Sequence, residues 1–121
     1  MFVVAHLLER GWKVLLPIGE NQRYDLVAER DGRFVRIQVK YVTPKRGMLE
    51  IKCASSNNWS LLRYSAKDID AIAAYDSKNE NIYFIPVSNV NRSSFNLRIE
   101  QSRNNQRLNI HAASAYCELK H

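Results

Sequence analysis

The sequence contains few residues of the kinds that cross-link a fold, bind structural metals or span membranes. Its 2 cysteines, Cys53 and Cys117, stand far apart, which excludes a disulfide framework and a C-x-x-C zinc site. The 3 histidines show no spacing typical of metal ligands. No apolar run approaches the roughly 18 residues that a membrane span needs, and the apolar start lacks the basic segment of a signal peptide. We therefore expect a cytoplasmic protein with reduced thiols and no membrane partner.

Glycine and proline are also scarce, at 4 and 3 of 121 residues, and no stretch rich in either residue forms a linker. Hydrophobic residues make up 45% and charged residues 25%, close to the average of globular proteins, so a core can be buried. The length suits one compact domain. We expect residues 1–121 to form a single domain of α/β or α+β class.

The chain carries more basic than acidic side chains. Its 18 Lys and Arg against 12 Asp and Glu give a formal net charge of +6, and this excess favours a polyanionic partner such as nucleic acid. A basic surface that only faces water is the alternative, because many basic domains bind no nucleic acid.

Hydrophobic periodicity predicts one helix at the start and several short strands. Apolar residues recur at helical spacing over residues 2–10, and Gly11 follows as a stop. Short apolar runs bounded by turn-prone residues predict the strands. These strands are 13–18, 23–30, 33–41, 48–53, 71–75, 82–87 and an edge strand 97–100. The Ala-rich segment 111–119 could end the fold as a helix or an irregular tail.

The pair Asp31-Gly32 is the strongest turn signal in the chain, because it lies between two strand-like runs and favours a two-residue type I′ hairpin. Such a turn fixes which residues face each other. On an apolar face the predicted pairs are Ala28–Val35, Leu26–Ile37 and Tyr24–Val39, and on a polar face they are Val27–Arg36, Asp25–Gln38 and Arg23–Lys40.

Three polar side chains of this hairpin could act together. Cross-strand partners have Cβ atoms about 4.5–5.5 Å apart, so Asp25, Gln38 and Lys40 can converge on one ligand. Oxygen ligands and a nearby positive charge are what metal-dependent phosphodiester hydrolysis needs, and the backbone carbonyl of Val39 could add another oxygen. The alternative is a polar face that only meets water. Asp25 favours a functional role over this alternative, because aspartate is unfavourable inside a strand.

The residues around this hairpin resemble a known family. The segments PIGENQRYDLV (17–27) and RIQVK (36–40) look like the signature of the PD-(D/E)XK nuclease superfamily, in particular the Q-x-K branch that includes some intron-encoded homing endonucleases. The likeness extends over residues 8–40, 64–87 and 103–106. It implies a restriction-endonuclease-like core, which is a mixed β-sheet with flanking helices.

The resemblance also implies roles for single residues. Asp25 would be the metal-binding aspartate, Gln38 would fill the second acidic position, and Lys40 would be the catalytic lysine. Tyr24 stands where the family name has proline. Family members commonly carry a glutamate on the first helix, and by spacing it would fall at or just before Met1. The stand-ins on the chain are Glu9 and Glu20, both of which are more typical of solvated charges.

Basic and amide side chains downstream are candidates for DNA contacts, because Lys and Arg neutralise phosphates while Asn can read adenine edges. The candidates are Lys45, Arg46, Lys52, Arg103, Asn104, Asn105 and Arg107. For each of them a solvated charge or amide is the alternative. One site cuts one strand, so double-strand cleavage predicts a homodimer or homotetramer.

These observations support one leading hypothesis and two rivals. The leading hypothesis is a DNA endonuclease that depends on Mg²⁺ or Mn²⁺, with Asp25 and Gln38 holding the metal and Lys40 stabilising negative charge. The first rival is a catalytically inactive DNA-binding module on the same fold. The second is a structure-specific nuclease similar to Holliday-junction resolvases.

Overall fold

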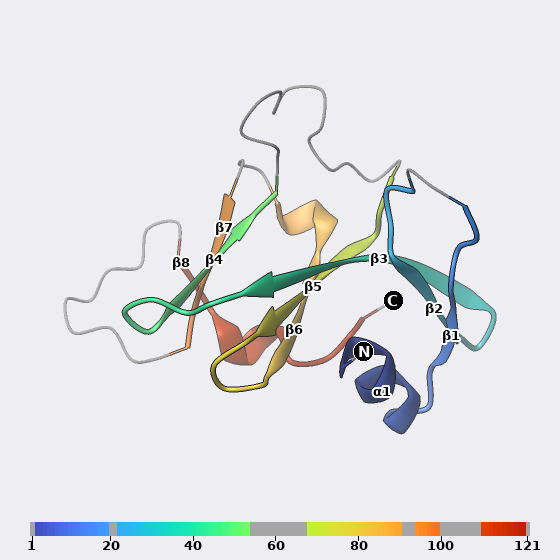
Figure 1. Cartoon of the computed structure of the whole chain (residues 1–121), viewed down its shortest axis with the longest axis horizontal. Helices are drawn as coiled ribbons and strands as arrows, with labels where there is room; N and C mark the ends of the chain where they lie inside the picture. Colours follow the sequence, from blue (N-terminus) through green and yellow to red (C-terminus); the bar gives the residue numbers. More distant parts are fainter. Residues whose placement is uncertain (1, 20–21, 54–67, 91–93, 100–109, 121) are drawn as a thin grey trace.

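The protein is built from one α-helix and two β-sheets in the described part of the chain (Figure 1). The computed structural model describes residues 2–19, 22–53, 68–90, 94–99 and 110–120. The elements are α1 (Phe2–Glu9), β1 (Lys13–Leu15), β2 (Leu26–Arg30), β3 (Arg33–Val42), β4 (Met48–Lys52), β5 (Ala71–Asp76), β6 (Ile82–Pro86), η1 (Val87–Asn89), β7 (Ser94–Arg98), β8 (Ile110–Ala112) and η2 (Ala113–Tyr116).

Both sheets are mixed. The larger sheet has five strands in the order β1-β2-β3-β5-β6, in which only β3 and β5 run parallel. The smaller sheet has three strands in the order β4-β7-β8, with β7 and β8 parallel. Because β3 continues into the turn before β4, the chain passes from the first sheet to the second directly after the segment that carries Gln38 and Lys40.

The larger sheet buries a hydrophobic core on each face. On one face α1 contributes Val3 and Leu7, and we call this the helix-side core. On the other face the smaller sheet packs against β5 and β6, and we call this the sheet-side core. Its members include Leu49, Ile51, Ile72, Ala74, Tyr83, Ile85, Phe95 and Leu97. All six residues of β5 are therefore buried, as expected for a strand covered on both faces.

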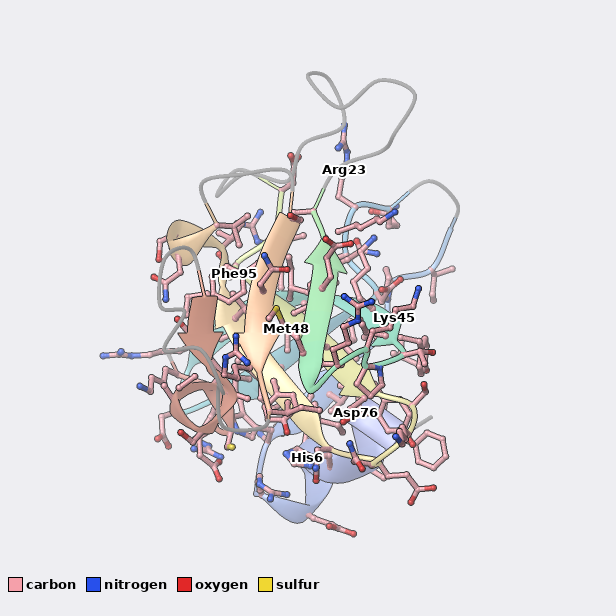
Figure 2. The ribbon with its side chains drawn as sticks, turned by 90° about the vertical axis from the view of Figure 1, so that its left-hand side faces the viewer. His6, Arg23, Lys45, Met48, Asp76 and Phe95 are labelled. Carbon is pink, nitrogen blue, oxygen red and sulfur yellow. The ribbon has the colours of Figure 1, made fainter. Side chains whose placement is uncertain are left out.

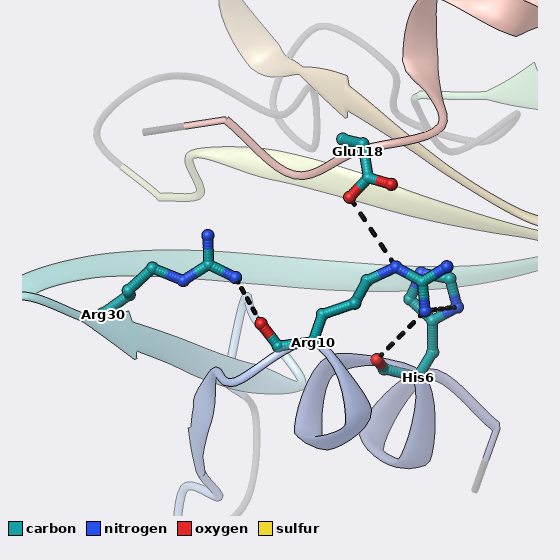
Figure 3. A network of polar contacts seen from close by, with 4 residues as sticks. All are labelled: His6, Arg10, Arg30 and Glu118. Carbon is teal, nitrogen blue, oxygen red and sulfur yellow. Dashed lines mark hydrogen bonds and ion pairs between the residues drawn. The ribbon is translucent and has the colours of Figure 1, made fainter.

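Polar contacts join α1 to the hairpin and to the C-terminal segment (Figure 3). The guanidinium of Arg30 donates to the Arg10 carbonyl at 2.7 Å and lies 4.0 Å from the ring centre of buried Trp12. The Arg10 side chain in turn lies 3.6 Å from the Glu118 carboxylate. Burial, followed by the positive charge of Arg10, lowers the pKa of His6 in the same network. The helix is thus fixed to the hairpin of β2 and β3 and to the C-terminal segment.

The predicted hairpin is confirmed at its turn. Asp31 and Gly32 both have positive φ, at 53° and 76°, as a type I′ turn requires. Five pairs join β2 and β3, from Arg30 with Arg33 back to Leu26 with Ile37. The local chemistry of two residues therefore sets the register of the two central strands.

The predicted register fails beyond Leu26, because the strand contains a β-bulge there. The amide of Asp25 donates to the Ile37 carbonyl at 2.8 Å although Ile37 is already the partner of Leu26, so two residues face one. Tyr24 consequently packs against the sheet-side core, while Val39 packs against the helix-side core. The predicted pairing of Tyr24 with Val39 is wrong, and with it the direct pairing of Asp25 with Gln38.

The other predicted elements agree in part. The helix and the hairpin of β5 and β6 are confirmed. The predicted edge strand 97–100 is wrong, because β7 begins at Ser94 and lies between β4 and β8. The C-terminal segment contains both expected features, because β8 is followed by the 3-10 helix η2 and then by residues 117–120 without regular structure. Both cysteines are free thiols, as expected. In the described ranges, no helix has the length and apolar character to cross a bilayer.

Substitution of Gly32 tests the turn. A Cβ at this position would meet no atom within 4 Å, so Gly32→Ala isolates the backbone cost of the left-handed conformation. We expect the free energy of unfolding to fall by about 1 kcal/mol, measured by urea denaturation. Asp31→Asn should change it little, because asparagine tolerates positive φ. Equal stability of Gly32→Ala and the wild type would contradict this account of the turn.

Candidate active site

The carboxylate of Asp25 is held directly against the middle of β3. Its Oδ2 accepts a hydrogen bond of 2.7 Å from the amide of Val39, the residue between Gln38 and Lys40. β2 begins only at Leu26, so the side chain of Asp25 takes the place that a backbone carbonyl of β2 would have in a longer ladder. The bulge and this hydrogen bond therefore fix an exposed carboxylate at the edge of β3.

The carbonyl of Val39 points to the same side as Asp25. Along β3 the carbonyls of Arg36 and Val42 accept from Asp70 and Ser77, on the side of β5, whereas the carbonyl of Ile37 accepts from Asp25. Backbone groups alternate in direction along a strand, which directs the Val39 carbonyl toward the Asp25 side. A carboxylate has further lone pairs after one hydrogen bond. Two oxygen atoms that could serve as metal ligands, from the Asp25 carboxylate and the Val39 carbonyl, thus lie at this edge.

Gln38 and Lys40 project from the face of β3 that bears the sheet-side core. They pair in register with Ile72 and Ala74, which are members of that core, and both are half-buried. Residues two apart in a strand lie on one face about 6.6 Å apart. The structure therefore brings Gln38 and Lys40 to one face and anchors Asp25 at the residue between them.

A groove of about 730 Å³ begins at Lys40 and continues over the turn before β4. Figure 2 looks toward the smaller sheet and shows Lys45 on this turn, beside Met48 at the start of β4. The charged residues that line the groove are Lys40, Lys45, Arg46, Lys52 and Glu50. Four cations against one carboxylate make this groove suited to a polyanion.

An ion pair fixes β3 just before the candidate site. Asp70 Oδ2 accepts from the backbone amide of Arg36 at 2.8 Å and from its Nε at 3.0 Å, and Oδ1 accepts from Nη2 at 3.0 Å. The Asp70 amide donates back to the Arg36 carbonyl at 2.9 Å. Hydrogen bonds from the Arg36 side chain lower the pKa of Asp70, and the Asp70 carboxylate raises the pKa of Arg36.

Comparison with known proteins identifies the family of this chain. A family model described as PD-(D/E)XK endonuclease matches residues 1–119. The chain belongs to the PD-(D/E)XK endonuclease family. No sequence among the curated proteins matches it.

A solved structure shares the fold of this PD-(D/E)XK chain. It is the bacterial homing endonuclease I-Ssp6803I, with a TM-score of 0.72 and 24% sequence identity, over 95% of this chain and 80% of that chain. The expected α+β, restriction-endonuclease-like fold is confirmed, and so is the resemblance that residues 17–27 and 36–40 indicated.

Several residues that the sequence offered as candidates are not brought to this candidate site. Glu9 is exposed on α1, which packs on the helix side, away from the face of Gln38 and Lys40. The disfavoured stand-in Glu20 lies outside the described part of the chain, and so do the predicted DNA contacts Arg103, Asn104, Asn105 and Arg107. Within the described ranges, no three His, Cys, Asp or Glu residues come together as a metal-binding group. A cation at Asp25 would therefore depend on amide and backbone oxygens.

Sequence reasoning missed two parts of this arrangement. The Arg36–Asp70 pair joins residues 34 positions apart, and no local pattern announces such a contact. Glu50 and Asn96 line the groove, but they read in the sequence as the outward positions of ordinary amphipathic strands. The one available signal for Asp70 was that it lies within residues 64–87, which are similar to the family.

Removal of the Asp70 carboxylate tests whether the ion pair of Arg36 with Asp70 stabilises the fold. Asp70→Ala should lower the free energy of unfolding at neutral pH by about 1–2 kcal/mol, because the pair is partly exposed and screened. The pKa of Asp70 is lowered from 3.8, so its contribution is present above that value and is lost as the pH falls through the lower folded-state pKa. Urea denaturation across this pH range measures both effects.

The control for Asp70→Ala is Asp31→Asn, which removes an exposed carboxylate at the hairpin turn. It should keep the acid-dependent loss of stability that the wild type shows, whereas Asp70→Ala should show a smaller loss over the same range. Identical pH dependence in Asp70→Ala and the wild type would contradict a stabilising role for the pair.

Proposed function

We propose that this chain is a DNA endonuclease that depends on a divalent cation, with Asp25, Gln38 and Lys40 as the centre of its site. The observation that carries the proposal is the 2.7 Å hydrogen bond from the Val39 amide to Asp25 Oδ2. It fixes a carboxylate beside the strand segment that presents an amide and an ammonium on one face. Membership of the PD-(D/E)XK endonuclease family supports phosphodiester hydrolysis as the reaction.

The residues at the edge of β3 suit a hard cation such as Mg²⁺ or Mn²⁺. Asp25 offers a carboxylate oxygen, Gln38 an amide oxygen and Val39 a backbone carbonyl oxygen, and such oxygens are the ligands that these cations prefer. Because Gln38 is neutral, it would hold the cation less strongly than a second carboxylate. When bound, the cation supplies stabilisation of phosphate charge and lowers the pKa of water.

The basic residues of the groove provide the substrate contacts. Lys40 lines the groove, and in this proposal its ammonium stabilises negative charge that develops on the scissile phosphate. Lys45 and Arg46 follow in the same groove and would bind adjacent phosphates. The predicted contacts of Arg103, Asn104, Asn105 and Arg107 belong to the same proposal.

Two further features follow from the proposed chemistry. Residues 1–121 would act as one catalytic domain with one site. Such a domain cuts one strand at a time, so cleavage of both strands requires a second copy of the chain, in a homodimer or homotetramer.

A catalytically inactive DNA-binding module is the second candidate function. It is favoured by one observation: within the described ranges, Asp25 belongs to no group of three or more His, Cys, Asp or Glu residues that could hold a metal ion. In that case the groove would bind DNA while the edge of β3 would hold a cation poorly.

Substitution of the site residues separates the two functions. Asp25→Ala and Lys40→Ala should each slow nicking of supercoiled plasmid in Mg²⁺ or Mn²⁺ by roughly 100-fold or more, since each removes a charge that acts in the transition state. Lys78→Ala is the matched control, because Lys78 is an exposed lysine in the turn between β5 and β6, and should cut like the wild type. Calorimetric titration with Mn²⁺ should show weaker cation binding for Asp25→Ala, but not for Lys40→Ala or Lys78→Ala.

Equal residual cleavage in the wild type and both site variants would end the enzymatic proposal. If the wild type then still bound duplex DNA in a mobility-shift assay, the inactive module would be the better description. Faster cleavage of branched than of linear DNA would instead indicate a structure-specific nuclease.

A further inference from the structure

We infer, on the basis of the proposed function, that the outer face of β4 and β7 reads the base sequence of the DNA through Glu50 and Asn96. Alternation along these two strands is strict. Leu49, Ile51, Phe95 and Leu97 are buried in the sheet-side core. The intervening residues Glu50 and Asn96 stand directly opposite each other in the ladder, on the face turned away from the core.

This outer face is continuous with the candidate active site. Glu50, Lys52 and Asn96 line the same groove as Lys40. A polyanion that places a phosphate at Lys40 therefore passes over β4 and β7. Strands of a β-sheet can enter a groove of duplex DNA, and β4 is an edge strand of its three-stranded sheet, which makes this face a suitable surface for contact with base edges.

The charge of Glu50 distinguishes a base contact from a phosphate contact. Glu50 is the one carboxylate among the charged residues that line the groove, and it is exposed. It forms no ion pair with any residue that the structure describes. A carboxylate next to a phosphate would be repelled, whereas a carboxylate next to a cytosine N4 amino group accepts a hydrogen bond. Its position in a basic groove therefore favours contact with bases.

The position of Glu50 along the turn that joins β3 and β4 also separates it from the candidate cation site. The bridge between Lys45 and Met48 sets a register that places Glu50 level with Thr43. Val42 and Ile51, which this register also pairs, both contact the sheet-side core, in agreement with it. Thr43 lies three residues beyond Lys40, or about 10 Å along a strand. Glu50 is thus too far from Lys40, measured along β3, to share a cation with Asp25.

The same spacing gives the expected position of the bases that are read. From the level of Gln38 to that of Thr43 is five residues, or roughly 16 Å. Base pairs rise by about 3.4 Å, so Glu50 and Asn96 would contact bases about three to five pairs from the scissile phosphate. Asn96, with an amide that donates and accepts, suits adenine. Lys52, on the same strand as Glu50, would bind a phosphate without regard to sequence.

A binding selection on duplexes with randomised base pairs tests the inference. In EDTA, the wild type should enrich a defined base at positions about three to five pairs from the cleavage point, which is mapped separately in Mn²⁺. Glu50→Gln and Asn96→Ala should each lower the preference there by roughly tenfold, as expected for loss of one base contact. Lys52→Ala should weaken binding to all sequences alike, and Lys78→Ala should match the wild type.

Each contrary result has a different meaning. If Glu50→Gln enriches the same bases as the wild type, base reading by Glu50 is wrong, whereas plasmid nicking by the wild type would still support the proposed function. If Glu50→Gln instead loses Mn²⁺ affinity in calorimetry, Glu50 is a metal ligand and the inference also fails. A wild type that selects these bases but never nicks DNA would overturn the proposed function and leave base reading in place. Urea denaturation of each variant excludes loss of folding as the cause.

Discussion

The hydrogen bond from the Val39 amide to the Asp25 carboxylate is the contact on which the candidate site depends. A strand that loses its neighbour leaves backbone amides without a ladder partner, and such groups need another acceptor. The bulge at Asp25 turns its side chain toward that amide, and a charged acceptor makes the stronger kind of hydrogen bond. The backbone of β3 therefore positions the carboxylate. The same hydrogen bond satisfies the Val39 amide and fixes Asp25 at the candidate site.

β3 can serve as the scaffold because its surroundings leave it little freedom. On one side it pairs with β5, which is buried on both faces. Two residues before Gln38, the ion pair of Arg36 with Asp70 fixes both the backbone and the side chain of the strand. Sites on rigid strands hold their geometry better than sites on loops. The edge left open beyond Leu26 is the part of β3 that remains available to a cation and a substrate.

How far the sequence predicts this arrangement depends on whether the information is local. Asp31-Gly32 predicts the turn and the register as far as Leu26, because backbone preferences of two residues determine both. The bulge at Asp25 could not be predicted, since it depends on where Tyr24 packs in the finished core. The pairing of Arg36 with Asp70 and the central position of β7 also follow from tertiary packing. The family resemblance indicates the candidate site residues, but it does not predict the way they are held.

The charges of the site connect cation binding to DNA binding in the proposed function. Asp25 contributes one negative charge, Gln38 contributes none, and Lys40 adds a positive charge beside them. A divalent cation held there would keep an excess of positive charge that only a phosphate of the substrate could balance. Because coupling between two ligands is reciprocal, DNA in the groove would strengthen cation binding and the cation would strengthen DNA binding. A neutral glutamine in place of an acid thus makes the substrate itself part of the electrostatic balance of the site.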